Sequence, residues 1–273
     1  MSRVRLTVQQ APALRVDLRG VTPAALAQLT APQIERVTLT HGTQTLALAE
    51  FFTVSCDDGP SADGELLFEG DLSRFDRIGW QTSSGRIVVD GPVGDYAGAC
   101  MSGGEVHVKG RAGMLAACEM TGGRLTIDGD VGDHAASSLP GSMDGMRGGA
   151  LVVRGNAGER FADRMRRGTA LVFGNAGDFL ASRLVAGTIA IGGHAGAHIG
   201  YGMRRGSIVF AGAAPQVAKT FVPALADAPV AWQLLARDLA RHGGPFAGLP
   251  ARRIQRHLGD LSADGKGELI VPV

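Results

Sequence analysis

The chain has 273 residues, of which 45% are hydrophobic and 41 are glycine, and its formal net charge is +1 at pH 7. The hydrophobic content excludes an intrinsically disordered protein, and the near-neutral charge excludes a general attraction to nucleic acid or to an anionic membrane. Glycine is about twice as frequent as its average of roughly 7%, without the three-residue period of collagen, and this indicates a fold with many turns.

The cysteines and the N-terminal segment exclude further classes of protein. Cys56, Cys100 and Cys118 have neither the C-x2-C spacing of zinc and iron–sulfur sites nor the dense pattern of a secreted disulfide framework. The N-terminal segment lacks the apolar stretch of a signal peptide, and no run of about 18 apolar residues occurs. We therefore expect a cytoplasmic protein that binds neither nucleic acid nor a membrane.

Residues 1–60 are expected to form a small α+β cap. TPAALAQL (22–29) and APQIERV (31–37) predict short helices, and TQTLALAEFF (43–52) predicts a strand.

Residues 61–213 contain a repeated unit, G-x5-G-x2-G, whose leading glycines are separated by 19, 19, 26, 19, 19 and 19 residues. These glycines are Gly85, Gly104, Gly123, Gly149, Gly168, Gly187 and Gly206, and a fainter first copy starts at Gly64. The second and fourth residues after the leading glycine are apolar in every copy, as in Ile87 and Val89, so each copy predicts a short strand with one buried face. Because such a strand cannot bury its face alone, successive copies must stack in parallel about 4.8 Å apart. The sequence therefore predicts an all-β core that forms a right-handed parallel β-helix, with glycines at its corners.

Two further columns of the repeat are expected in the interior. One is always small, and consists of Gly98, Ala117, Ala136, Ala162, Ala181 and Gly200. The other closes each copy and consists of Met101, Met120, Met146, Met165, Leu184 and Met203. A methionine column could hold a metal or a cofactor, but stacked core is the favoured interpretation.

The fourth copy has seven extra residues, which we place at 139–145 as a loop on one edge. Insertions in solenoids commonly lie on faces that meet partners. The repeat ends near Pro215, and residues 214–273 are expected to form a C-terminal helical cap and tail. Residues 217–243 predict one or two amphipathic helices that cover the open end of the solenoid.

The sequence contains no familiar catalytic or metal-binding motif. Neither H-E-x-x-H nor H-x-H nor a P-loop is present. His134 and His198 share a repeat position but lie three copies apart, roughly 15 Å, which is too far for a shared metal. His194 and His198 could chelate weakly, although solvated histidines are the favoured interpretation. We expect no catalytic residue, cofactor or metal on this chain.

One set of charged residues recurs with the repeat. Arg147, Arg166 and Arg204 share one repeat position, and Arg167 and Arg205 share the next, so stacking places them in a file along one edge. Either acidic side chains such as Asp163 and Glu159 neutralise them, or an anionic ligand lies along them.

The repeat, preceded by PQIERVTLTHGTQTLALAEFF and followed by RRIQRHLGDLSADGKGEL, resembles the C subunit of formylmethanofuran dehydrogenases, in particular the bacterial version in formyltransferase/hydrolase complexes. The repeat alone is shared with the C-terminal domain of the glutamate synthase large subunit. The tail is more specific, through Gly259, Asp260, Gly265, Lys266, Gly267 and Glu268.

The resemblance implies a non-catalytic scaffold subunit in tetrahydromethanopterin-linked one-carbon metabolism. The complex would transfer a formyl group from formyl-tetrahydromethanopterin to a methanofuran-type carrier such as methylofuran, and hydrolyse it to formate. The implied partners are an amidohydrolase-like zinc subunit, a formyltransferase subunit and a further subunit. The arginine file would hold the carrier's polyglutamate tail. Two alternatives stay open, the C subunit of a tungsten or molybdenum formylmethanofuran dehydrogenase and a glutamate-synthase-like structural module.

Overall fold

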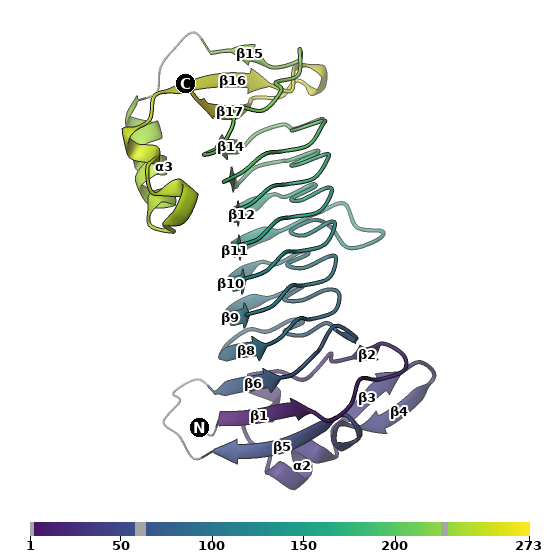
Figure 1. Ribbon diagram of the computed structural model, residues 1–273. Helices are drawn as coiled ribbons and strands as arrows, with labels where there is room; N and C mark the ends of the chain where they lie inside the picture. The colour runs from purple at the N-terminus through teal and green to yellow at the C-terminus, as the bar shows by residue number, and fades with distance from the viewer. Residues whose placement is uncertain (1–2, 58–63, 225–228) are drawn as a thin grey trace.

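The computed structural model describes residues 3–57, 64–224 and 229–273 (Figure 1). The N-terminal part contains β1 (Arg3–Val8), β2 (Val16–Asp17), α1 (Pro23–Leu26), α2 (Ala31–Glu35), β3 (Thr38–His41), β4 (Gln44–Ala47), the 3-10 helix η1 (Leu48–Glu50) and β5 (Phe52–Asp57). The stacked coils contain β6 (Glu65–Glu69), β7 (Phe75–Asp76), β8 (Arg86–Asp90), β9 (Ser102–Val108), β10 (Gly122–Ile127), β11 (Arg147–Val153), β12 (Arg167–Val172), β13 (Thr188–Ile191) and β14 (Ser207–Phe210). The C-terminal part contains β15 (Val222–Pro223), α3 (Pro229–Ala240), β16 (Ile254–Gly259), β17 (Gly267–Pro272) and the 3-10 helices η2 (Gly244–Phe246), η3 (Leu249–Ala251) and η4 (Leu261–Ala263).

The repeats build one large sheet. It has 13 strands within the described residues, and the strands from β6 to β14, apart from β7, pair in parallel from each copy to the next, with β14 as the last. Ile87 lies opposite Val106, for example, and both are fully buried. A second line of parallel bridges runs from Leu72 through each coil to Ala195. The prediction of an all-β core is confirmed, and Figure 1 shows the copies as stacked coils.

The corners of the coils need glycine for two different reasons. The leading glycines have positive φ, such as +79° at Gly85. At Gly110, in the second glycine column, φ is not the constraint, but a Cβ would lie 2.6 Å from the backbone of Gly91 in the coil before. Between these corners the turns use left-handed alanines as well, and Ala162 has φ +59°.

Both interior columns predicted from the sequence are buried. Ala117, Ala136, Ala162 and Ala181 have no exposed surface, and the same holds for the column of Met101, Met120, Met146, Met165, Leu184 and Met203. These methionines pack in the main hydrophobic cluster with the strand residues. The interpretation of the methionine column as core is therefore confirmed.

The N-terminal part continues the large sheet and adds a small one. Strand β1 lies between β6 and β5, while β4, β3, β2 and β7 form a separate four-stranded sheet. Both predicted short helices are present as α1 and α2. The single strand predicted at residues 43–52 is wrong, because η1 divides it: β4 pairs in the small sheet and β5 in the large one.

The C-terminal part differs from the expectation. The described portion of residues 217–243 contains one helix, α3, and the short strand β15, and residues 225–228 lie outside that portion. Its buried residues Trp232, Ala236 and Leu239 belong to a cluster with the outward-facing residues Val152, Leu171, Ala190 and Val209 of β11–β14. The helix therefore covers the outer face of the sheet rather than the open end of the stack.

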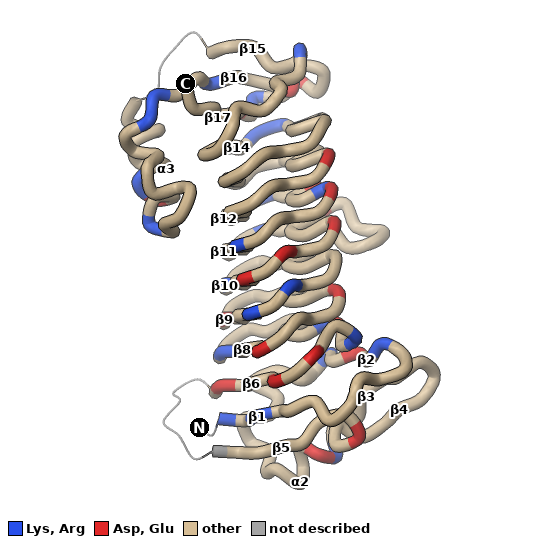
Figure 2. The backbone as a smooth tube through the Cα atoms, in the orientation of Figure 1, with Lys and Arg blue, Asp and Glu red and all other residues tan. Residues whose placement is uncertain are grey.

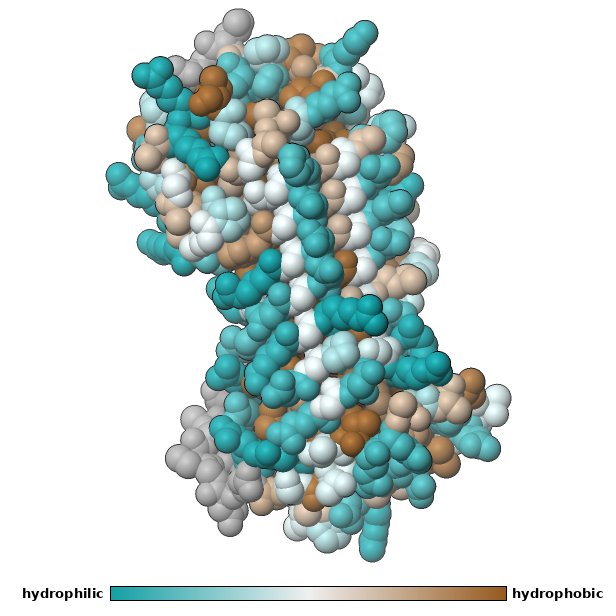
Figure 3. All heavy atoms as spheres, in the orientation of Figure 1, coloured by the Kyte–Doolittle hydropathy of each residue, from teal (hydrophilic) through white to brown (hydrophobic). Residues whose placement is uncertain are grey.

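Strands cover the open end instead. Strand β17 pairs in parallel with β14, and β16 and β15 extend the sheet in antiparallel fashion. The added strand satisfies the backbone N–H and C=O groups that β14 would otherwise expose at the edge. Figure 3 shows the coils as a narrow waist between two broader ends, and Figure 2 shows charged residues of both signs at the bends and strand ends.

Candidate anion-binding site

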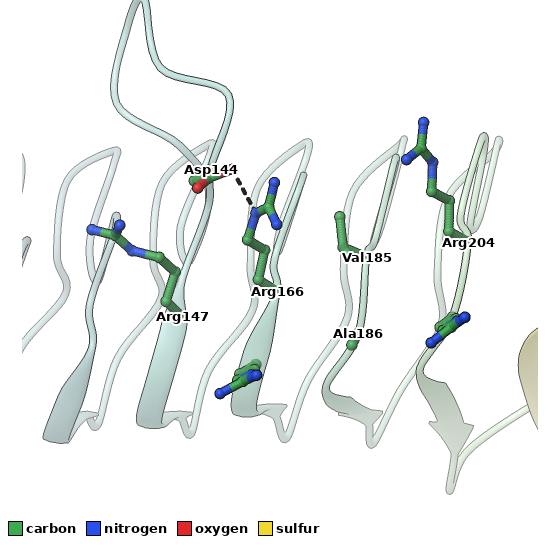
Figure 4. A pocket seen from close by; sticks show the side chains of 8 residues that line it. Asp144, Arg147, Arg166, Val185, Ala186 and Arg204 are labelled. Carbon is green, nitrogen blue, oxygen red and sulfur yellow. Dashed lines mark hydrogen bonds and ion pairs between the residues drawn. The ribbon is translucent and has the colours of Figure 1, made fainter.

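The five arginines predicted as a file line one surface cavity. Its volume is about 600 Å³, and its lining consists of Asp144, Arg147, Arg166, Arg167, Val185, Ala186, Arg204 and Arg205. In Figure 4, Arg147, Arg166 and Arg204 come from different coils and project to the same side of the stack. The structure thus brings together all of the arginines that the repeat aligned.

The backbone ladder sets their spacing. The amide of Arg166 donates to the carbonyl of Met146 at 2.8 Å, and that of Arg204 donates to the carbonyl of Leu184 at 2.8 Å. Between these two coils the equivalent positions are Val185 and Ala186, so the file has an apolar gap one coil wide. The register also shifts between Arg147 and Ala150, so that Arg147 is paired with Arg167.

Two carboxylates face the cluster, and they are not the ones that the sequence suggested. Asp144 accepts from Nε of Arg166 at 2.5 Å, and Glu119 lies 3.9 Å from Arg147. Asp163 pairs instead with Arg183, at 2.6 Å. The Asp163 side chain is buried in the turn beside Arg183 and does not face the arginine file. Glu159 forms no ion pair with the cluster in the part of the chain that the structure describes.

The cluster therefore keeps uncompensated positive charge. Arg167, Arg204 and Arg205 are exposed and form no ion pair with another described residue. Five guanidinium groups face two carboxylates, which leaves a local excess of three positive charges. Guanidinium groups form paired hydrogen bonds with carboxylates and phosphates, so the arrangement is suited to binding an anion.

A second cavity of about 390 Å³ adjoins the first, and they share Arg166, Val185 and Arg204. Its other walls come from Met143, Arg164, Arg183, Gly202, Ala263 and Asp264. The sequence reasoning missed Asp144, Arg164 and Arg183 as neighbours of the file. The seven-residue insertion was the available signal for Asp144, since an extra loop beside the file could contact it.

Comparisons with known proteins identify relatives of this chain. No protein-family model matches it. It is 35% identical over 100 residues to the C subunit of tungsten-containing formylmethanofuran dehydrogenase 2 from Methanothermobacter thermautotrophicus, which covers 36% of this chain and 37% of the relative. It is 42% identical over 80 residues to the C subunit of the formyltransferase/hydrolase complex Fhc from Methylorubrum extorquens, 29% of each chain. The matched segment is thus about a third of the length of these curated relatives.

A solved structure extends the match to nearly the whole chain. One chain of the formyltransferase/hydrolase complex (FhcABCD) from Methylorubrum extorquens, determined in complex with methylofuran, superposes with a TM-score of 0.90. The two sequences are 38% identical, and the match covers 98% of this chain and 99% of the other. This chain belongs to the family of formylmethanofuran dehydrogenase C subunits.

No group of three or more His, Cys, Asp or Glu side chains is placed to hold a metal in residues 3–57, 64–224 and 229–273. His198 instead stacks on Phe179, with 4.6 Å between the ring centroids. Burial raises the pKa of Cys118 to about 12, and burial also raises the pKa of Cys100, so both thiols stay protonated at neutral pH. Among the described helices, none has the length and apolar character needed to cross a membrane.

Proposed function

We propose that this chain is the non-catalytic scaffold subunit of a formyltransferase/hydrolase complex. The complex would transfer a formyl group from formyl-tetrahydromethanopterin to a methylofuran-type carrier and hydrolyse it to formate in the cytoplasm. The observation that carries the proposal is the full-length match, at 38% identity, to a chain of such a complex. The partners would be an amidohydrolase-like subunit with zinc, a formyltransferase subunit and a further subunit.

The architecture supports a scaffolding role. We infer that the stacked coils form a right-handed parallel β-helix, because the crossover connection between two parallel strands of one sheet is right-handed in about 98% of cases. We further propose three units, the N-terminal cap 1–60, the coils 61–213 and the C-terminal unit 214–273. A solenoid of this kind presents a long, continuous lateral surface on which several subunits can bind side by side.

The first test is a purification of the complex. We expect the tagged chain, expressed with its partner genes, to co-purify with a formyltransferase and an amidohydrolase-like subunit. The complex should turn over formyl-tetrahydromethanopterin, whereas the full chain alone should show no turnover and bind no stoichiometric metal, since the described residues offer no metal cluster. Turnover by the chain alone would disprove the scaffold role.

A second candidate function is supported by the relatives from Methanothermobacter species. The C subunits of three tungsten-containing formylmethanofuran dehydrogenases are 32–35% identical to this chain over about 100 residues. If this chain served such a redox enzyme, the purified complex would contain a molybdopterin with tungsten or molybdenum and would absorb visible light through iron–sulfur clusters. Metal analysis and an absorption spectrum of the same preparation distinguish the two functions.

For the arginine cluster, we propose that it binds the polyglutamate tail of the carrier. The supporting observations are the cavity, the local excess of positive charge and the repetition of guanidinium groups from coil to coil. A polyglutamate chain carries carboxylates along its length and can contact several coils at once.

We expect the variant Arg166→Gln, Arg167→Gln, Arg204→Gln and Arg205→Gln to assemble normally. Its apparent KM for the polyglutamylated carrier should rise about tenfold, and the dependence of KM on salt should flatten. Steady-state kinetics at several salt concentrations measure both. The matched control removes four exposed arginines elsewhere on the coils, Arg86, Arg111, Arg124 and Arg154. An unchanged KM at every salt concentration would assign the cluster a structural role, and loss of assembly would assign it to a subunit interface.

A further inference from the structure

The inserted loop of the fourth copy lies against the arginine cluster. That copy is 26 residues long where its neighbours have 19, and the extra residues 139–145 project from the stack of coils (Figure 1). Figure 4 shows Asp144, at the base of this loop, directed toward Arg166. Asp144 is therefore the residue by which this loop contributes to the cavity wall.

The contact itself resembles the binding of a ligand. The Asp144 carboxylate accepts from Nε of Arg166 at 2.5 Å, within the cavity that the five arginines line. Beside it, the amide of Gly145 donates to the Arg164 carbonyl at 3.0 Å and holds the base of the loop against the next coil. Asp144 thus occupies one of the positions that a carboxylate of an external chain would take.

The ion pair between Asp144 and Arg166 is weak. The side chains of Arg166 and Asp144 are 46% and 35% exposed, and ion pairs exposed to this degree shift an equilibrium by only about 1.4-fold to fivefold. A ligand that gains contacts elsewhere in the cavity can therefore displace Asp144. Arg167, Arg204 and Arg205 are available for such contacts, because they have no ion-pair partner among the described residues.

We propose that residues 139–145 form an autoinhibitory strap over the arginine cluster. In the closed state the Asp144 carboxylate is paired with the Arg166 guanidinium group. An oligocarboxylate chain that binds both Arg204 and Arg166 displaces the Asp144 carboxylate. This inference rests on the proposed binding of a polyglutamate chain at the same site.

Because of the apolar gap at Val185 and Ala186, the effect of the strap on binding depends on the length of the ligand. Arg204 and Arg166 stand two coils apart, which corresponds to about 10 Å. A small anion such as sulfate can bind at Arg204 and Arg205 without competing with Asp144. A chain long enough to reach Arg166 must compete, so only the longer ligand should respond to the state of the strap.

The test measures binding of hexaglutamate and of sulfate to the full chain by calorimetry at about 0.15 M salt. Asp144→Asn removes the competing charge and keeps the shape of the side chain. We expect hexaglutamate to bind about two- to fivefold more tightly to this variant, with sulfate binding unchanged. The matched control is Asp264→Asn, which removes a carboxylate from the adjoining cavity and should change hexaglutamate binding by less than about 1.5-fold.

Hydrogen exchange of residues 139–145 separates the possible failures. We expect faster exchange in Asp144→Asn, and in the wild-type chain when hexaglutamate is added. Suppose that the wild-type chain bound hexaglutamate at the arginines, that loop exchange did not change, and that Asp144→Asn did not tighten binding. The proposal of a strap would then be wrong, and the proposal of a carrier site would be supported. If neither protein bound hexaglutamate, both the strap and the carrier site would be wrong, while co-purification would still test the scaffold role.

Discussion

Replacing Ala162 with leucine is expected to lower the free energy of unfolding by about 3 kcal/mol, at the upper end of the range for overpacking. Ala162 is fully buried, and coils stack on both sides of it, since its amide donates to Ala135 and the Ala181 amide donates to Phe161, both at 2.8 Å. A leucine adds three carbons to a column that contains only alanine and glycine. The coils cannot move apart without stretching these bonds.

The control at the same position is Ala162→Gly. Gly98 and Gly200 occupy this column naturally, and φ at Ala162 is +59°, a region that favours glycine. The relief of backbone strain should offset most of the lost methyl burial, so we expect a change of less than about 1 kcal/mol. Urea denaturation of the full chain measures both variants. Equal destabilisation by leucine and glycine would mean that steric crowding does not limit this column.

The largest effect at the C-terminal end is expected at Asp260. This residue is 2% exposed, and its carboxylate joins the β16–β17 connection to the last coil. One oxygen accepts from the amide of Gly202 at 2.9 Å, and the other accepts from the amide and the hydroxyl of Ser262, at 3.0 and 2.7 Å. In Asp260→Asn, the new NH2 group must face one of these donor sets. We expect a loss of about 2 to 4 kcal/mol in the free energy of unfolding, because the buried side chain loses hydrogen bonds to a charged group and its new NH2 group is left facing donors.

The stability that Asp260 contributes should depend on pH. Burial raises the pKa of Asp260, but the hydrogen bonds from Ser262, Gly202 and Thr220 outweigh it, so this pKa lies below its usual value. A lowered carboxyl pKa contributes stability above the unfolded pKa of about 3.9, and this contribution is lost as the pH falls through the folded value. The stability difference between wild type and Asp260→Asn should therefore shrink below about pH 4.

Denaturation curves between pH 3 and pH 7 test this dependence. Asp264→Asn, in the same connection but exposed, is the control and should change stability by about 0.5 kcal/mol or less. A difference between wild type and Asp260→Asn that stayed constant down to pH 3 would contradict the assigned hydrogen-bonded carboxylate.

The repeat made most of the coil structure predictable. A glycine every 19 residues and apolar residues at alternate strand positions leave one arrangement in which a five-residue strand can bury its face, which is a stack of parallel copies. The burial of the alanine and methionine columns followed from the same register. So did the gathering of the five arginines, because equal repeat positions in a stack are neighbours in space.

The ends of the stack were less predictable because their structure depends on long-range pairing. Residues 267–272 have no glycine repeat, yet they become the next strand because β14 offers unpaired backbone groups. Likewise, α3 has an ordinary amphipathic pattern. This pattern predicts that one face of the helix is buried, but it does not indicate which element that face packs against. Its position on β11–β14 follows from the outward apolar residues of those strands, such as Leu171, which only the folded sheet brings side by side.

The sequence by itself determined the repeat, its buried columns and the alignment of the arginines, since each depends on a fixed spacing along the chain. Only the tertiary structure decided which carboxylates face those arginines. Asp163 is nearer to Arg166 in the sequence than Asp144 is, but its side chain is buried in the turn beside Arg183. Asp144 reaches Arg166 because the base of the inserted loop lies against the next coil, where the amide of Gly145 donates to the carbonyl of Arg164. Repeat spacing contains no information about the path of an insertion.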